Sequence, residues 1–186
     1  MPRPDRSHER IPAILGAAAK IFARDGVQGA KLDDVAAEAG LSKAAIYLYF
    51  KNKDALVFAL LEQFFDANLS ALKMIPEGNS TADRLCDWLA IVGEAMEGGA
   101  HFQSVGFEFL ALAGRDDKAR KMVLGFYEQY AATIAEMLKT DGVPNSTEKA
   151  REIVALLEGL NLLWMVHNGE LEFIKTAQSG VRALLG

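Results

Sequence analysis

The residue types within 32–50, LDDVAAEAGLSKAAIYLYF, are suited to contacts with a nucleic acid rather than to covalent catalysis. Lys43 supplies a positive charge that reaches guanine or a phosphate. The small side chains of Ala44 and Ala45 allow close approach to base edges and can touch a thymine methyl group. This chemistry requires a short helix whose N-terminal residues enter the major groove.

The same segment has the pattern that places two short helices across one another. Ala36 and Ala39 offer small side chains at the crossing, and Gly40 supplies the positive φ that the turn requires. Ser42 is a suitable N-cap for the second helix. We therefore predict a helix-turn-helix, with Val35, Leu41 and Ile46 as its small core. The alternative is a helical hairpin without a DNA-binding role.

Other chemistry is poorly supported by the sequence. His8, His101 and His167 are far apart, and Cys86 is the single cysteine, so no metal-ligand spacing is present. We read Asp116-Asp117 as a helix-capping pair. No Gly-x-Ser-x-Gly or comparable nucleophile arrangement occurs. We expect neither an enzyme nor a metal ion or cofactor.

Charge is divided unevenly along the chain. The net charge is −5 overall, but residues 1–53 carry nine basic and six acidic side chains, which leaves −8 for the remainder. An acidic body directs phosphate toward the basic end. Because the chain shows no signal-peptide core and no apolar run of membrane-spanning length, we expect a cytoplasmic protein.

Helical periodicity dominates the sequence and predicts an all-α fold of about nine helices. Residues 1–53 are expected to form a three-helix, helix-turn-helix DNA-binding domain, and residues 54–186 a helical bundle for ligand sensing and dimerisation. The expected helices cover 7–25, 32–39, 42–50, 52–75, 81–97, 102–113, 117–140, 147–167 and 170–185, with turns near 76–79 and 168–169.

Residues 10–56 resemble the N-terminal signature of the TetR family of bacterial one-component regulators. The resemblance is carried by ILGAAAKIFARDG and VAAEAGLSKAAIYLYFKNKDAL, above all by the run Tyr47-x-Tyr49-Phe50-x-x-Lys53. It implies that the helix from Ser42 to Tyr49 reads the groove and that Tyr47, Tyr49 and Lys53 hold phosphates. For the two tyrosines, core packing is the alternative; Phe50 is assigned to the core.

The chain departs from the family pattern at several positions. Lys31 stands where a capping threonine is common, so it cannot cap but can pair with phosphate. Ala44-Ala45 replaces a frequent Gly-Thr, and Lys51 replaces a proline. Beyond about residue 60 the resemblance is architectural: a helical domain that dimerises through its last two helices and holds a small-molecule pocket.

The helix expected at 147–167 is apolar on two faces. One face carries Ile153, Leu157, Leu160, Trp164 and His167, and the other carries Ala155, Leu156, Gly159, Leu163 and Val166. A helix of this kind must be covered on both sides. We expect Leu156, Gly159, Leu163 and Val166 to form a homodimer interface; the alternative is a central helix buried within one subunit.

Aromatic residues are abundant between 81 and 167. A pocket between bundle helices combines apolar walls with a few polar groups, and we expect a lipophilic or aromatic effector there. The expected lining is Trp88, Phe107, Phe126, Tyr130 and Trp164, for each of which ordinary core packing is the alternative.

Together these features predict a homodimeric, ligand-responsive repressor that binds an inverted-repeat operator in double-stranded DNA. A DNA-binding regulator that no small molecule controls is the second hypothesis. A helical enzyme with an appended DNA-binding-like domain is the third, and it lacks any acid/base or nucleophile constellation.

Overall fold

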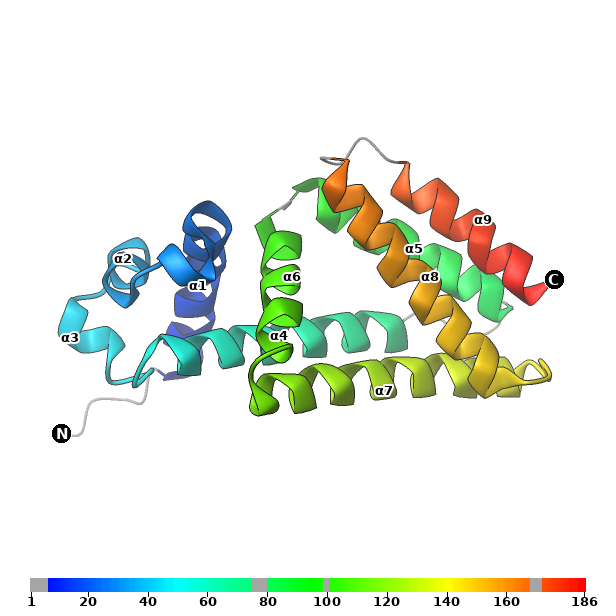
Figure 1. The fold of residues 1–186 in the computed structure, drawn as a ribbon, viewed down its shortest axis with the longest axis horizontal. Helices are drawn as coiled ribbons and strands as arrows, with labels where there is room; N and C mark the ends of the chain where they lie inside the picture. The colour runs from blue at the N-terminus through cyan, green and yellow to red at the C-terminus, as the bar shows by residue number, and fades with distance from the viewer. Residues whose placement is uncertain (1–6, 75–79, 99–100, 168–171) are drawn as a thin grey trace. The chain divides into compact units, whose positions relative to one another are not determined.

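The computed structural model describes residues 7–74, 80–98, 101–167 and 172–186, which form nine helices and no strand (Figure 1). The all-α prediction is confirmed. The turns predicted at 76–79 and 168–169 lie outside the described residues. The helices are α1 (Ser7–Gly29), α2 (Leu32–Glu38), α3 (Lys43–Ile46), α4 (Lys53–Lys73), α5 (Thr81–Gly98), α6 (His101–Ala113), α7 (Asp117–Thr140), α8 (Ser146–Val166) and α9 (Phe173–Leu185).

Packing divides the chain into two compact units. The first comprises residues 1–64 and 100–120, and the second comprises residues 65–99 and 121–186. These units are defined by packing contacts, whereas the boundary predicted after residue 53 separates a DNA-binding part from a ligand-sensing and dimerisation part. That functional boundary therefore stays a prediction.

In the first unit, α1 packs against both α2 and α6. Its buried surface is consequently wider than a single stripe and includes Ile14, Leu15, Ala18, Ile21 and Phe22. Ile11, near the start of the helix, is 37% exposed. Gly26 interrupts the helix with φ 70°, at the predicted stop.

The start of α4 completes this unit. The Asn52 side chain accepts a hydrogen bond from the Ala55 N–H at 2.8 Å and so satisfies one of the unpaired donors of the first turn. Leu56 and Leu60 are fully buried, while Phe64 is half-buried. The first turns of α4 thereby contribute to the core of the unit that contains the helix-turn-helix.

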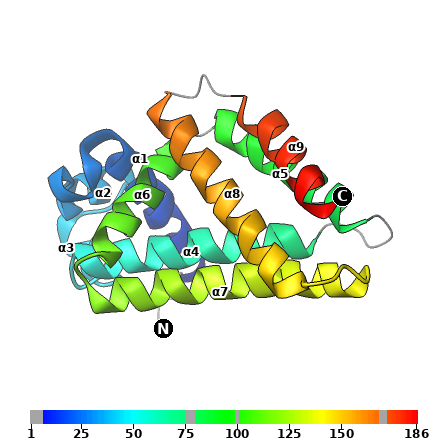
Figure 2. The same cartoon turned by 45° about the vertical axis from the view of Figure 1, so that its right-hand side comes forward.

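In the second unit, α9 packs along α5 and α8 (Figure 2). Two glycines allow the close approach: a Cβ on Gly93 would lie 2.5 Å from Ile174 Cδ1, and one on Gly180 would lie 2.6 Å from Leu156 Cδ2. The core of the unit is built from Leu72, Leu85, Leu89, Ile134, Leu138, Ile153 and Val181, among others.

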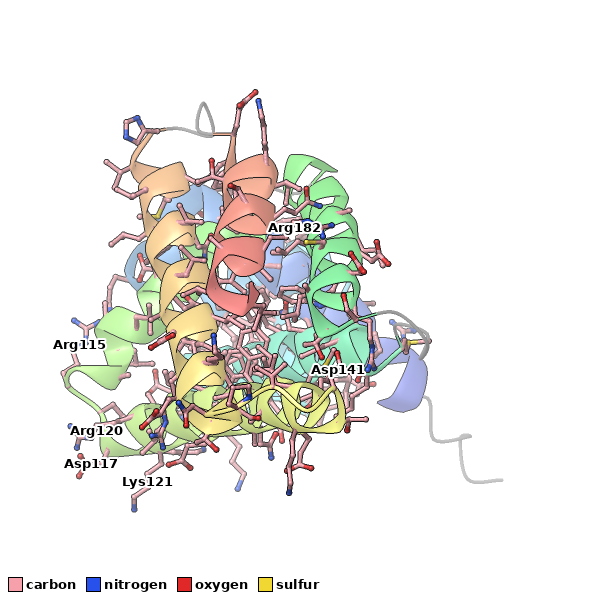
Figure 3. The ribbon with its side chains drawn as sticks, turned by 90° about the vertical axis from the view of Figure 1, so that its right-hand side faces the viewer. Arg115, Asp117, Arg120, Lys121, Asp141 and Arg182 are labelled. Atoms are coloured by element: carbon pink, nitrogen blue, oxygen red, sulfur yellow. The ribbon has the colours of Figure 1, made fainter. Side chains whose placement is uncertain are left out.

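Polar contacts also join α9 to α5. The Gln178 side chain donates to the Cys86 carbonyl at 3.0 Å, and Arg182, which is labelled in Figure 3, pairs with Asp83 at 3.0 Å. The ion pair is exposed, so it contributes little to stability compared with the buried apolar contacts.

The first turn of α5 is capped from a distant point in the sequence. One carboxylate oxygen of Asp141 accepts hydrogen bonds from the Thr81 N–H at 2.5 Å and from the Thr81 hydroxyl at 2.7 Å. Asp141, just after α7, is labelled in Figure 3. Both bonds favour the charged carboxylate, and they lower the pKa of Asp141 below its ordinary value.

Asp141→Ala should reduce the free energy of unfolding by about 0.5–2 kcal/mol at pH 7, as expected for loss of a cap. Since the folded pKa is lowered, the stabilisation is present above the ordinary pKa and is lost as pH falls through the folded value. Urea unfolding should therefore show that the difference in the free energy of unfolding between wild type and Asp141→Ala becomes smaller in strong acid. Asp66→Ala, at an exposed position of α4, is the control and should show no comparable gap; a gap independent of pH would contradict the capping role.

Candidate functional site

The turn between α2 and α3 is closed by two backbone hydrogen bonds. The Leu41 N–H donates to the Ala36 carbonyl at 2.8 Å, and the Gly40 N–H donates to the Ala37 carbonyl at 3.1 Å. This is the Schellman arrangement, which requires a left-handed residue after the helix. Gly40 supplies it with φ 65°. The predicted reason for a glycine here is confirmed.

The helix after this turn starts at the predicted residue. The Ser42 hydroxyl accepts a hydrogen bond from the Ala45 N–H at 3.2 Å, so Ser42 is the N-cap. The α-helix ends at Ile46, however, and residues 47–49 continue as turns. The predicted helix from Ser42 to Tyr49 is therefore too long, because the chain must turn at buried Phe50 to enter α4.

Side chains of α3 and the following turn separate into an inner and an outer set. Ile46 is fully buried and Ala45 is half-buried. Lys43 and Ala44 are exposed at the start of the helix, as contact with a groove requires. Ser42, the cap itself, is exposed as well.

The two tyrosines differ in their surroundings. The Tyr47 side chain is 46% exposed, which makes its hydroxyl accessible to a phosphate. Tyr49 is half-buried. Leu48, which the sequence analysis did not select, is 83% exposed between them. An exposed leucine beside a reading helix is suited to apolar contact with a thymine methyl or a sugar.

Lys43 is held by an ion pair that the sequence analysis also missed. Its Nζ lies 2.7 Å from Asp33 Oδ2, in the first turn of α2. The hydrogen bond to Asp33 and its charge raise the pKa of Lys43. Both side chains are largely exposed, so the pair is weak in water. For a DNA phosphate to bind Lys43, it must either displace the Asp33 carboxylate from the lysine or lie close to that negative charge.

Two further lysines were predicted to meet phosphate. Lys53 Nζ donates to the carbonyls of Gln28 at 3.0 Å and Ala30 at 3.2 Å, so it secures the segment after α1 to the start of α4. An ammonium has three donors, which leaves one for phosphate. Lys31 precedes α2 without a side-chain capping bond, as predicted, and is exposed.

The five predicted effector residues do not lie in one unit. Phe107 is a half-buried residue of α6 in the first unit. The others belong to the second unit, where Trp88, Phe126 and Tyr130 are at least nine-tenths buried and Trp164 is half-buried against the same apolar cluster. The four residues of the second unit are thus grouped, whether they serve as core or as pocket lining.

The second unit also contains a half-buried carboxyl group. Glu158 of α8 accepts a hydrogen bond from the Tyr127 hydroxyl, and burial raises the pKa of Glu158. The pKa of Tyr130 is raised by burial first and by the charge of Glu158 second. An acid within the apolar run Leu156-Leu157-Glu158-Gly159-Leu160 was the signal available in the sequence.

The predicted dimer residues fall into two groups. Gly159, Leu163 and Val166 are exposed, the latter two at 48% and 67%. They share the outer side of α8 with Ala155 and Leu162, and we call these five residues the α8 stripe. Leu156 is half-buried and contacts Gly180 of α9. Within the described residues, no other segment covers the stripe in a single subunit.

Comparison with known proteins identifies the first part of the chain. Residues 14–60 match the sequence model of the family described as bacterial regulatory proteins, tetR family. The HTH-type regulator RutR of Escherichia coli is 42% identical over 65 residues, which cover 35% of this chain and 31% of that protein. The likeness to RutR thus concerns less than a third of that regulator.

Longer similarities are weaker in identity. YfiR, an uncharacterized HTH-type transcriptional regulator of Bacillus subtilis, is 26% identical over 141 residues, 74% of this chain and 69% of that one. The structure of the B. subtilis transcriptional regulator FadR in complex with stearoyl-CoA superposes with a TM-score of 0.81 at 17% identity, over 94% of this chain and 97% of that one. At this level of identity the structural similarity is evidence for the fold alone.

Asp33→Asn should strengthen binding to duplex DNA about three- to tenfold near 0.15 M salt, because it releases Lys43 and removes a negative charge beside the phosphates. The dependence of log affinity on log salt should steepen by about one phosphate contact. Fluorescence anisotropy with labelled duplex measures both.

Glu38→Gln is the matched control for this experiment. It makes the same change in charge on α2 but acts on the exposed pair with Lys20, 3.1 Å away, and leaves the Lys43 contact intact. Equal gains from the two variants would show that net charge, rather than release of Lys43, is responsible.

Proposed function

We propose that the chain is a transcriptional regulator of the TetR family that acts as a homodimeric repressor, released from an inverted-repeat operator by a small lipophilic or aromatic effector. The observation that carries the proposal is the surface of α3 and the turn after it. Lys43 and Ala44 are exposed on the capped helix, and Tyr47 is exposed just beyond its end. The relatives are regulators of transcription rather than enzymes.

The residues of the interface have separable roles in this proposal. Ser42, Lys43, Ala44 and Ala45 meet the base edges, whereas Tyr47, Tyr49, Lys31 and Lys53 position the backbone. Contacts to phosphate fix register without reading sequence. Leu48 adds an apolar contact to the reading set.

A homodimer is supported by the α8 stripe. Its side chains are apolar, contiguous along one side of the helix and exposed. An apolar surface of this kind is the sort that a second subunit covers. Gly159 lies in the middle of the stripe, where the absent side chain lets the partner helix approach closely. A symmetric dimer also presents two α3 helices to one face of a duplex.

Control by an effector is supported by the grouped aromatic residues of the second unit. Trp88, Phe126, Tyr130 and Trp164 supply apolar surface beside the polar Tyr127 and Glu158. The structurally similar FadR of B. subtilis was crystallised with stearoyl-CoA. A regulator that no small molecule controls is the second candidate, favoured by the close stacking of these aromatic rings as an ordinary core.

Operator binding places the protein in the cytoplasm. By length and apolar composition alone, α4 would pass as a membrane span. Its Leu56, Leu60 and Leu72, however, are fully buried, and a core helix of a soluble protein meets the same criteria. We therefore assign α4 to the protein core.

Selection from a random duplex pool should return an inverted repeat whose half-sites lie about one helical turn apart (~34–36 Å) or slightly more. Tyr47→Phe should weaken binding to all sequences alike, about three- to tenfold, because it removes a phosphate donor. Lys43→Ala should in addition relax preference at one position. If the wild-type protein without effector prefers no sequence over random DNA at ~150 mM salt, the proposed function fails.

Leu163→Lys should convert the dimer to a monomer that binds the operator poorly, since it places a charge in the apolar stripe. Leu124→Lys is the matched control, because Leu124 of α7 is 55% exposed and lies outside the stripe. Sedimentation velocity at micromolar concentration distinguishes the two. A wild-type monomer under these conditions, or equal effects of both substitutions, would contradict the assigned interface.

A further inference from the structure

A buried donor in the second unit has no acceptor. Trp88 of α5 is 5% exposed, and its indole Nε1 makes no hydrogen bond within the described part of the chain. The ring lies against Tyr130, with 5.7 Å between ring centroids. Because a buried N–H without a partner costs free energy, folded proteins rarely retain one unless something else meets it.

Tyr130 connects this donor to a carboxyl group. Glu158 lies close enough to raise the pKa of Tyr130, and it accepts a hydrogen bond from Tyr127, one turn before Tyr130 on α7. Burial raises the pKa of Glu158, and no Lys or Arg among the described residues contributes a compensating charge. A carboxylate has acceptor capacity for about four hydrogen bonds, so one tyrosine hydroxyl leaves most of it unused.

A second unused acceptor lies nearby on α8. Asn161 is three residues after Glu158, which puts both on one side of the helix. Its Oδ1 is buried without a donor among the described residues. Within the second unit, α5 therefore carries one donor, and α8 carries two acceptors, whose hydrogen-bonding capacity the described residues leave unused.

Aromatic rings border this group of polar atoms. Phe126 stacks on Phe65 with 3.9 Å between centroids and lies 5.6 Å from Tyr130. Aromatic faces attract cations as well as flat apolar groups. An anionic head group would meet the carboxylate of Glu158 with no basic side chain to offset the repulsion, and it would leave the acceptors unsatisfied.

We infer that the effector of this protein carries a protonated amine on a flat apolar body, with Glu158 as the counter-ion of the amine and the aromatic rings around Tyr130 as the contact for the body. Asn161 accepts a second hydrogen bond from the ammonium, which has donors to spare. The inference rests on the proposed function, since it assigns the chemical class of the effector that function requires.

Three probes with one aromatic body test the inference on the wild-type protein. They are 2-(1-naphthyl)ethylamine, 2-(1-naphthyl)ethanol and 1-naphthylacetate, which are cationic, neutral and anionic at pH 7. Calorimetry and quenching of tryptophan fluorescence measure binding. We expect the amine to bind at least about tenfold tighter than the alcohol, which corresponds to one charge-assisted hydrogen bond, and the carboxylate to bind weakest.

Glu158→Gln should remove the preference for the amine while leaving the affinity for the alcohol nearly unchanged. Glu152→Gln is the matched control, because Glu152 is an exposed acid of the same helix, and it should retain the preference. The ranking of the probes on wild-type protein does not require any variant to fold. Tightest binding of the carboxylate, equal binding of all three, or no binding at millimolar concentration would overturn the inference.

Operator binding is measured in parallel to separate this inference from the function on which it rests. If the protein binds an inverted repeat and a neutral or anionic molecule releases it, the proposed function stands and the cationic effector class is wrong. If the amine binds at Glu158 but the protein shows no sequence preference for DNA, the regulator assignment fails while the site itself stands.

Discussion

The DNA-binding surface depends on the backbone reversal at Gly40. Two hydrogen bonds end α2 there, and two residues later the Ser42 hydroxyl starts α3. Both helices are too short to be stable in isolation, so the angle between them is set by this closed turn and by Ile46 and Val35 packed beneath it. A residue with a Cβ at Gly40 would strain the positive φ and would disturb the placement of every contact on α3.

Electrostatic contacts within the protein oppose as well as assist the binding of DNA. Lys43 is paired with Asp33, and Lys53 donates to two carbonyls that close the end of α1. Both basic residues therefore have a structural role in the protein itself, and in the proposed complex they would bind phosphate in addition. An exposed pair such as Lys43–Asp33 is weak enough for a phosphate to replace the carboxylate. In the proposed complex Asp33 would then lower the general affinity for DNA, so that binding would depend more on the correct position of α3 in the groove.

The sequence was sufficient to predict the fold where one local pattern determines it. The all-α class, the glycine of the turn and the Ser42 cap follow from periodicity and capping chemistry and are confirmed. The length of α3 does not follow from these local patterns, since it depends on where Phe50 must be buried. The Asp33–Lys43 pair joins residues ten apart on two helices, so it depends on a crossing angle that no local pattern encodes. For the interior, the aromatic residues were visible in the sequence, whereas the importance of Glu158 emerges only when α7 places Tyr127 beside it.

The position of Glu158 gives α8 a double role within the proposed regulator. Glu158 is half-buried, and the next residue, Gly159, belongs to the outer α8 stripe. Successive residues of a helix are about 100° apart, so in the proposed regulator one rigid element would carry both the counter-ion for an effector and the contact for a second subunit. A ligand that changes the position of Glu158 must shift the stripe with it, because packed helices move as units rather than deform continuously. In a symmetric dimer a small displacement of α8 would change the orientation of one subunit relative to the other. The two α3 helices bind an operator only when the distance between them matches the spacing of its half-sites.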